Sequence, residues 1–215
     1  MPYDTLEVRW FFDGSLAEAA PEVEAWFSRV TPHGIEGNRH SCSWPAAWRR
    51  DRYLTLAGAE DMGVKLREGR LEFKGRVDTF GAERFADRVR GVTERWMKWS
   101  HAIGTRPDDA MSVVLVEKRR ILRRLNLAGG TLVEIPSGPS TTDPAVDFEL
   151  TRIRFAGSPT ETHWSLAFEA FPYDSGLHGV FNRIVGDLLA EWPLEALSAE
   201  SSMSYPAWLS QLVTD

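Results

Sequence analysis

An alternation of apolar and polar residues recurs along the chain and predicts β-strands. In the first such run, 5–12, every second side chain is apolar, and Glu7 and Arg9 share the opposite face. Successive side chains of a strand point to opposite faces, so several of these runs have one apolar face and one face that bears charges. The same pattern predicts strands at 5–12, 49–56, 62–78, 111–126, 131–136, 146–155 and 163–171.

Two segments have the spacing of amphipathic helices. The first extends from Ser15, a suitable cap, to about Val30, with an expected interruption at Pro21. The second covers 177–191 and ends before Pro193, because proline disfavours a helical residue in front of it. We expect its apolar stripe to pack on the outside of the sheet; the stripe comprises Leu177, Val180, Phe181, Ile184, Val185 and Leu188.

The remaining segments are less regular. The segment 204–212 is a short amphipathic stretch near the C-terminus, and 81–102 is compatible with either strand or helix. Strands and helices do not alternate as in a parallel sheet, and no linker divides the chain. The pattern therefore predicts a mainly β (α+β) fold. We expect an antiparallel barrel of about eight strands with peripheral helices, formed by one domain over 1–215.

Composition narrows the possible classes of protein. The single cysteine, Cys42, excludes a disulfide scaffold and a cysteine-based zinc cluster. No apolar run approaches the roughly 18 residues of a membrane span, and the first residues lack the apolar core of a signal peptide. We therefore expect a cytoplasmic protein without a membrane partner.

Charge is distributed unevenly along the chain. The net charge is −6, yet residues 49–124 carry 19 basic and 12 acidic side chains. A basic middle region in an acidic protein favours a local anion site over general affinity for nucleic acid. Trp96 and Trp99 beside Arg95 and Lys98 would suit a single-stranded nucleic acid, but packing is the commoner role of such residues, so nucleic acid is an unlikely partner.

Several predicted strands carry basic residues at alternate positions, and each set therefore shares one face. These residues are Lys65, Arg67, Lys74, Arg76, Lys118 and Arg120. Two arrangements fit this pattern. The charged faces lie outside in solvent, or the sheet closes with its charged faces inward and binds a polyanion, whose oxygens basic groups would neutralise.

Seven segments in chain order carry a family resemblance: EVRWF at 7–11, DRYL at 51–54, VKLREGRLEFKGR at 64–76, VEKRR at 116–120, DFELTRIRFAG at 147–157, HWSLAFEAF at 163–171 and SMSYPAWL at 202–209. Their order resembles the CYTH-like, or triphosphate tunnel metalloenzyme, superfamily. The resemblance covers almost the whole chain except 79–110. It implies an antiparallel barrel, or tunnel, whose interior binds triphosphate and a divalent metal.

The same resemblance implies roles for individual residues. It implies that the six basic residues bind phosphate and that Glu7, Glu149 and Glu169 hold Mg²⁺ or Mn²⁺. The opening motif departs from the family's Glu-x-Glu-x-Lys, because Arg9 and Phe11 occupy its second and third positions. We therefore expect weak or absent turnover of standard triphosphates.

Three functions are compatible with the sequence. The first is a metal-dependent triphosphatase whose barrel binds a phosphorylated small molecule, such as an organic triphosphate or nucleotide. The second is a barrel that binds such an anion without turnover. The third is a carrier whose barrel encloses an apolar ligand. The sequence leaves open whether the protein is an enzyme and whether it forms a homodimer.

Overall fold

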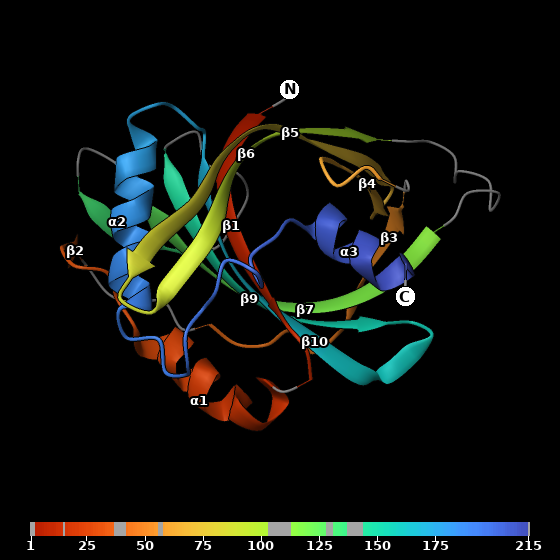
Figure 1. Cartoon of the computed structure of the whole chain (residues 1–215), viewed down its shortest axis with the longest axis horizontal. Coiled ribbons are helices and arrows are strands. Elements are labelled where there is room, and N and C mark those ends of the chain that lie inside the picture. The colour runs from red at the N-terminus through yellow and green to blue at the C-terminus, as the bar shows by residue number, and fades with distance from the viewer. Residues whose placement is uncertain are drawn as a thin grey trace.

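The computed structural model describes residues 3–14, 16–36, 42–55, 58–102, 113–127, 131–136 and 144–214. Eight strands form a closed antiparallel barrel (Figure 1). They are β1 (Tyr3–Phe12), β3 (Arg49–Leu54), β4 (Met62–Arg67), β5 (Arg70–Ala86), β6 (Val89–Ala102), β7 (Val113–Asn126), β9 (Ala145–Phe155) and β10 (Ser158–Phe171). Around the barrel the order is β7-β3-β4-β5-β6-β1-β10-β9, and β9 pairs with β7 to close it.

The other elements lie around this barrel. The short strands β2 (Ile35–Glu36) and β8 (Leu132–Ile135) extend the sheet beyond the end of β7. The helices are α1 (Leu16–Arg29), α2 (Leu177–Leu189) and α3 (Tyr205–Thr214). The predicted class, a mainly β antiparallel barrel with helices, is confirmed. In the described part of the chain, no helix is long and apolar enough to cross a membrane.

Each predicted strand segment contains a strand, and the hairpin within 62–78 forms as expected. Its turn consists of Glu68 and Gly69, with φ angles of 51° and 73°. Two consecutive positive φ angles match the type I′ geometry that suits the twist of a hairpin, and glycine adopts such a φ without strain. The expected strand at 131–136 corresponds to β8, which lies outside the closed barrel. Residues 56, 111 and 112, at the ends of predicted strands, lie outside the described residues.

Two expectations need correction or completion. The ambiguous segment 81–102 is strand: β5 continues to Ala86 and β6 occupies the rest of the segment. The interruption expected at Pro21 is wrong, because α1 continues through it. The expected cap, Ser15, lies outside the described residues.

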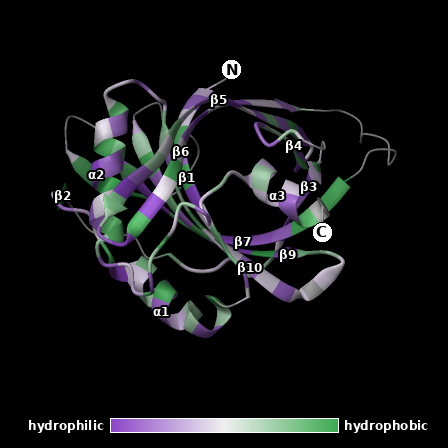
Figure 2. Cartoon of the chain, in the orientation of Figure 1, coloured by the Kyte–Doolittle hydropathy of each residue, from purple (hydrophilic) through white to green (hydrophobic). Residues whose placement is uncertain are grey.

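The main hydrophobic core lies outside the barrel, between its wall and the helices. Along β1, Leu6, Val8 and Trp10 face outward and are almost fully buried. Trp26 and Phe27 of α1 join this core. So do Leu177, Phe181, Ile184, Val185 and Leu188 of α2, while Val180 is partly buried against it. The predicted apolar stripe of α2 on the barrel exterior is confirmed. Figure 2 shows hydrophilic and hydrophobic residues alternating along the barrel strands.

The third helix covers part of the barrel interior. Tyr205 and Trp208 of α3 pack with Phe11 and Tyr53, which face inward from β1 and β3. The rings of Phe11 and Trp208 stack at 4.4 Å between centroids. In Figure 1, α3 lies within the ring of strands, near β3, β4 and β7. This second, smaller core fills one side of the interior and leaves the other side to polar residues.

Candidate functional site

Charged side chains line the inside of the barrel. In an antiparallel sheet, directly paired residues point to the same face. Glu7 of β1 pairs with Glu169 of β10 and with Glu94 of β6, so all three carboxylates face inward. We call the enclosed space the lumen. Among the described residues, the basic side chains on this face are Arg9, Arg49, Lys65, Arg67, Arg70, Lys74, Arg76, Lys98, Lys118, Arg120 and Arg124; the acidic ones are Glu7, Asp51, Glu72, Glu94, Asp147, Glu149 and Glu169.

Solvent reaches part of the lumen. The side chains of Lys74 and Lys98 are each 18% exposed, and that of Arg120 is 38% exposed. Burying an unpaired charged group away from water costs several kcal/mol. The charged groups of this wall avoid that cost because they are paired with one another and partly hydrated. Water therefore reaches Lys74, Lys98 and Arg120.

Two lysines lie between the paired carboxylates of β1 and β10. Lys98 Nζ is 2.5 Å from Glu169 Oε1 and 3.7 Å from Glu7 Oε2. Lys74 Nζ donates to the same Glu7 oxygen at 2.8 Å and lies 4.1 Å from the ring centre of Trp96. The ammonium groups thus occupy the place where a cation would bridge Glu7 and Glu169.

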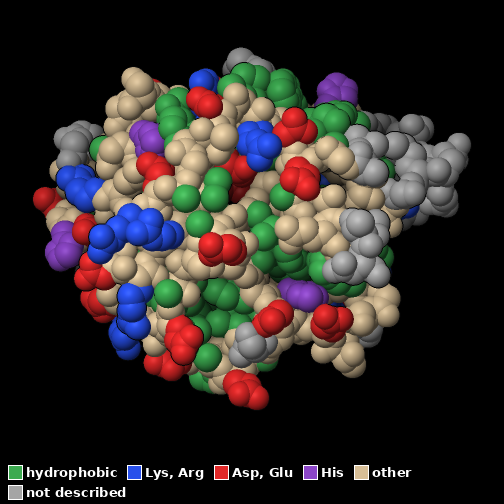
Figure 3. All heavy atoms as spheres, in the orientation of Figure 1, with side chains coloured by type: hydrophobic (Ala, Val, Ile, Leu, Met, Phe, Trp, Pro, Cys, Tyr) green, Lys and Arg blue, Asp and Glu red, His purple; other side chains and the backbone are tan. Residues whose placement is uncertain are grey.

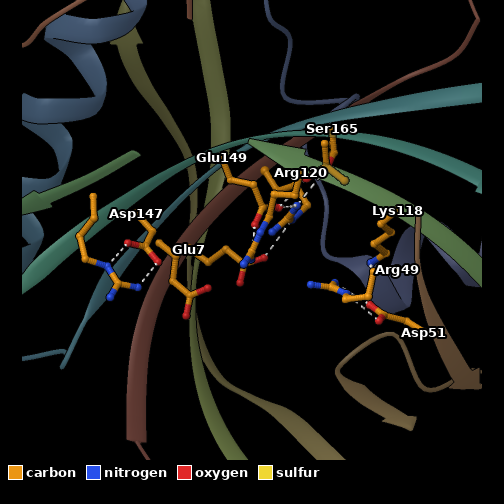
Figure 4. A network of polar contacts seen from close by, with 12 residues as sticks. Glu7, Arg49, Asp51, Lys118, Arg120, Asp147, Glu149 and Ser165 are labelled. Atoms are coloured by element: carbon orange, nitrogen blue, oxygen red, sulfur yellow. Dashed lines mark hydrogen bonds and ion pairs between the residues drawn. The ribbon is translucent and has the colours of Figure 1, made fainter. Parts of the chain in front are cut away.

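Glu149 lies at the centre of a second group, shown in Figure 4. It accepts hydrogen bonds from Arg9 Nη1 and Arg120 Nη1, both at 2.9 Å, and from the Thr151 hydroxyl at 3.0 Å. Arg9 also donates to Glu7 at 3.2 Å and to Ser165 at 3.1 Å. Arg9 therefore joins the two groups into one network across β1, β9 and β10.

The pKa values follow from this network. Burial opposes ionisation of Glu7, but Lys74 and Arg9 outweigh it and hold the Glu7 pKa well below its usual range. The same holds for Glu149: burial raises its pKa, but the charges of Arg9 and Arg120 outweigh this effect and lower the pKa well below its usual range. Burial, only partly offset by Glu7, lowers the pKa of Lys74 to about 8. Lys74 shares Glu7 with Lys98 and Arg9, so the attraction it receives is smaller than the cost of its burial.

Lys118 lies at the boundary between the lumen and α3. Its Nζ donates to the Tyr53 hydroxyl at 2.6 Å and lies 3.4 Å from the ring centre of Tyr205. Its side chain is 6% exposed, and Asp51, at 3.8 Å, is itself held by Arg49. Burial lowers the pKa of Lys118 well below that of an ordinary lysine. Of the six basic residues expected to bind phosphate, Lys118 is the least accessible.

The other expected basic residues face the lumen with a carboxylate beside each. Lys65 and Arg67 bind the two oxygens of Glu72, at 3.0 and 2.8 Å. Arg76 donates to Glu94 at 2.7 Å. The structure therefore brings the six residues to one lumen, but on different parts of its wall.

The three carboxylates expected to hold metal do not form a coordination site. Glu7 and Glu169 are directly opposite in the register, but Arg9 separates Glu7 from Glu149, and each carboxylate already binds a lysine or arginine. Among the described residues, no group of three His, Cys, Asp or Glu side chains is placed to hold an ion. Mg²⁺ requires several converging oxygens in near-octahedral geometry, and this arrangement does not fit it.

Sequence reasoning missed several residues of the site. In the sequence, Arg9 stands out only as a departure from a motif, yet it links Glu7 to Glu149. Lys98 was considered only as part of a nucleic-acid surface, and it faces the lumen, whereas Arg95 points outward to Asp4. The alternation of Glu94, Trp96 and Lys98 was the available signal.

Comparison with known proteins adds no relative: no protein-family model matches the chain, and no curated protein matches it. The barrel alone does not identify a family, because one fold supports many functions.

Proposed function

We propose that the lumen binds a small phosphorylated organic anion, such as an organic triphosphate or a nucleotide, in a divergent member of the CYTH-like superfamily. The observation that carries this proposal is the excess of basic over acidic side chains on a lumen wall that water reaches. Phosphate oxygens are strong acceptors for guanidinium and ammonium groups. The charged wall gives no support to an apolar ligand.

Binding would proceed by exchange of partners. Lys74, Lys98 and Arg120 are partly exposed cations next to the network of Arg9, and each now binds a carboxylate. An incoming phosphate would share these cations with Glu7, Glu169 and Glu149. Arg9 is 8% exposed and would hold the carboxylates in place while the outer cations turn to the ligand.

The carboxylates do not fit a divalent metal, so we propose no hydrolytic step through one. If Mg²⁺ or Mn²⁺ enters with the ligand, Glu7 and Glu169 would first have to exchange their lysines for the ion. We therefore propose binding as the function, and hydrolysis as an activity to be tested separately.

The experiment compares two double variants of equal net charge. Lys74→Ala with Arg120→Ala removes two lumen cations, whereas Arg50→Ala with Arg154→Ala removes two cations that bind Glu117 on the outer face. Tripolyphosphate at millimolar concentration should raise the melting temperature of the native protein and of the outer-face variant. The shift should disappear in the lumen variant. Equal shifts in both variants, or none in the native protein, would refute the proposal.

A further inference from the structure

An apolar surface lies on the outer face of β4, of the first half of β5 and of the second half of β6. Lys65 and Lys74 face the lumen from β4 and β5, so the residues next to them in each strand face outward. Direct pairing places the outward residues of the three strands side by side in three rows. We call this surface the apolar patch; its members are Met62, Leu66, Leu71, Phe73, Met97 and Trp99.

The described part of the chain leaves this patch uncovered. Met62, Phe73 and Trp99 are 42%, 38% and 42% exposed, and they are half of the large apolar side chains that are exposed in the described residues. No member of the patch belongs to either hydrophobic core, because α1 and α2 pack on other parts of the wall and α3 lies inside the barrel. Figure 3 shows hydrophobic side chains along the upper edge of the molecule, over β5. Contiguous exposed apolar side chains of this kind mark an interaction surface.

The size of the patch indicates how strongly a partner can bind. Its three strands lie about 4.8 Å apart, and alternate residues along a strand lie about 6.8 Å apart. With the side chains around them, three rows on three strands cover roughly 400 Å². Stable dimers bury about 800 Å² on each partner, and transient contacts bury less than about 600 Å². The area therefore suits a reversible association.

The two ends of the patch differ in charge. Arg52 and His101 are directly paired with patch residues at the end nearest the β4–β5 turn. At the other end, the exposed Glu60 and Asp61 precede Met62. A two-fold axis that runs across the strands, along the row of Phe73 and Trp99, would turn one copy end for end on the other. It would bring the basic end of each copy opposite the acidic end of its partner, whereas an axis along the strands would bring like charges together.

We propose that the apolar patch is the interface of a reversible dimer of two copies of this chain, packed sheet against sheet about this axis. Phe73 and Trp99 lie on the axis, so each meets the same residue of the other copy and loses its contact with water. Burial of these apolar side chains supplies the binding energy, and the opposite charges at the two ends fix the orientation. The interface is on the outer face of the barrel and does not depend on the function proposed for the lumen.

Sedimentation velocity between about 1 and 500 µM protein tests the dimer. We expect the mass to rise with concentration from that of one chain toward that of two. Phe73→Glu should weaken the association at least about tenfold, because it places two carboxylates face to face on the axis. Leu212→Glu is the matched control: Leu212 is 39% exposed, against 38% for Phe73, but it lies on α3, and its variant should associate like the native protein. Equal melting temperatures of the two variants at low concentration would show that Phe73→Glu still folds.

A charge exchange tests the axis. Asp61→Arg alone should weaken the dimer several-fold, because it faces Arg52 of the other copy, and addition of Arg52→Glu should restore the association. Glu18→Arg, the same change of charge at an exposed position of α1, should have no effect. A native protein that stays monomeric at every concentration, equal association of the Phe73→Glu and Leu212→Glu variants, or no recovery in the double variant would overturn the proposal. A monomeric protein that floats with phosphatidylcholine vesicles would overturn it in favour of a lipid surface.

Discussion

Replacing Glu149 by Gln should change stability and anion affinity in opposite directions. The substitution keeps the size of the side chain and removes one negative charge from the lumen wall. In the native protein, Glu149 accepts hydrogen bonds from Arg9 and Arg120, both at 2.9 Å. The amide of Gln keeps one acceptor oxygen in place of two, so at least one of these guanidinium groups loses its anionic partner.

The loss of stability follows from burial. The side chains of Glu149 and Arg9 are 15% and 8% exposed, so water compensates little for the missing charge. A hydrogen bond to a charged group contributes about 1.5–3 kcal/mol, and removing one partner of a buried pair costs about 3–5 kcal/mol. Since Gln retains one bond and no cavity forms, we expect a loss of about 2–3 kcal/mol.

The gain in affinity follows from the released charge. Two unit charges about 6 Å apart at an effective dielectric constant of about 40 interact by about 1.4 kcal/mol, which is about tenfold in affinity. Tripolyphosphate carries several charges, so tenfold is a lower bound for its improved binding. Urea unfolding followed by tryptophan fluorescence measures the stability, and calorimetric titration measures the affinity.

Glu117→Gln is the matched control for this substitution. Glu117 accepts hydrogen bonds from Arg50 and Arg154, both at 2.7 Å, but it lies on the outer face of β7. It should lose stability without gaining affinity. The reasoning fails if Glu149→Gln binds tripolyphosphate more weakly than the native protein, because the carboxylate would then contribute to binding, as a metal ligand would.

Three further predictions concern the lumen and the core. A bound anion favours the charged form of Lys74, whose pKa is about 8, so the affinity for tripolyphosphate should fall as pH rises above 8. The fall should be smaller in Lys74→Arg. If calorimetry gives the same pH profile for both proteins, Lys74 does not contact the anion. Phe181→Ala should lower the free energy of unfolding by about 3–5 kcal/mol, since Phe181 is fully buried, and Val180→Ala should lower it less; urea midpoints check both. The native protein should release phosphate from tripolyphosphate or ATP, with Mg²⁺ or Mn²⁺ present, no faster than the Glu169→Gln variant does. Robust turnover that is lost in that variant would show that a metal site forms on binding.

The fold was predictable because apolar and polar residues alternate along its strands. Which face of each strand points into the barrel was not predictable. Alternation in β1 separates Glu7 and Arg9 from Leu6, Val8 and Trp10, and this holds whether the charges face water or a lumen. The apolar face points outward because Trp26 and Phe181, from helices distant in the sequence, pack against it. Strand pattern alone contains no information about that cover.

The ambiguity of 81–102, which contains β6, has a different reason. Inward-facing Glu94, Trp96 and Lys98 of β6 mix charge with an aromatic ring, and outward-facing Met97 and Trp99 are apolar but partly exposed. Neither face is uniformly polar or apolar, so no period of two appears. The place of α3 inside the barrel was equally hidden, since an amphipathic end segment fits either surface.

The pairing within the lumen would allow the wall to be stable without a ligand and still release cations to the phosphorylated anion that we propose. Glu72 has two cationic partners, Lys65 and Arg67, and Glu149 likewise has Arg9 and Arg120. A ligand can therefore draw one cation away and leave the carboxylate with the other. Donors also remain available: the Arg120 side chain is 38% exposed and uses only one of its three guanidinium nitrogens among the described residues. A phosphate offers more acceptor oxygens than a carboxylate and can use these donors, so this surplus favours phosphorylated ligands over simple carboxylic acids.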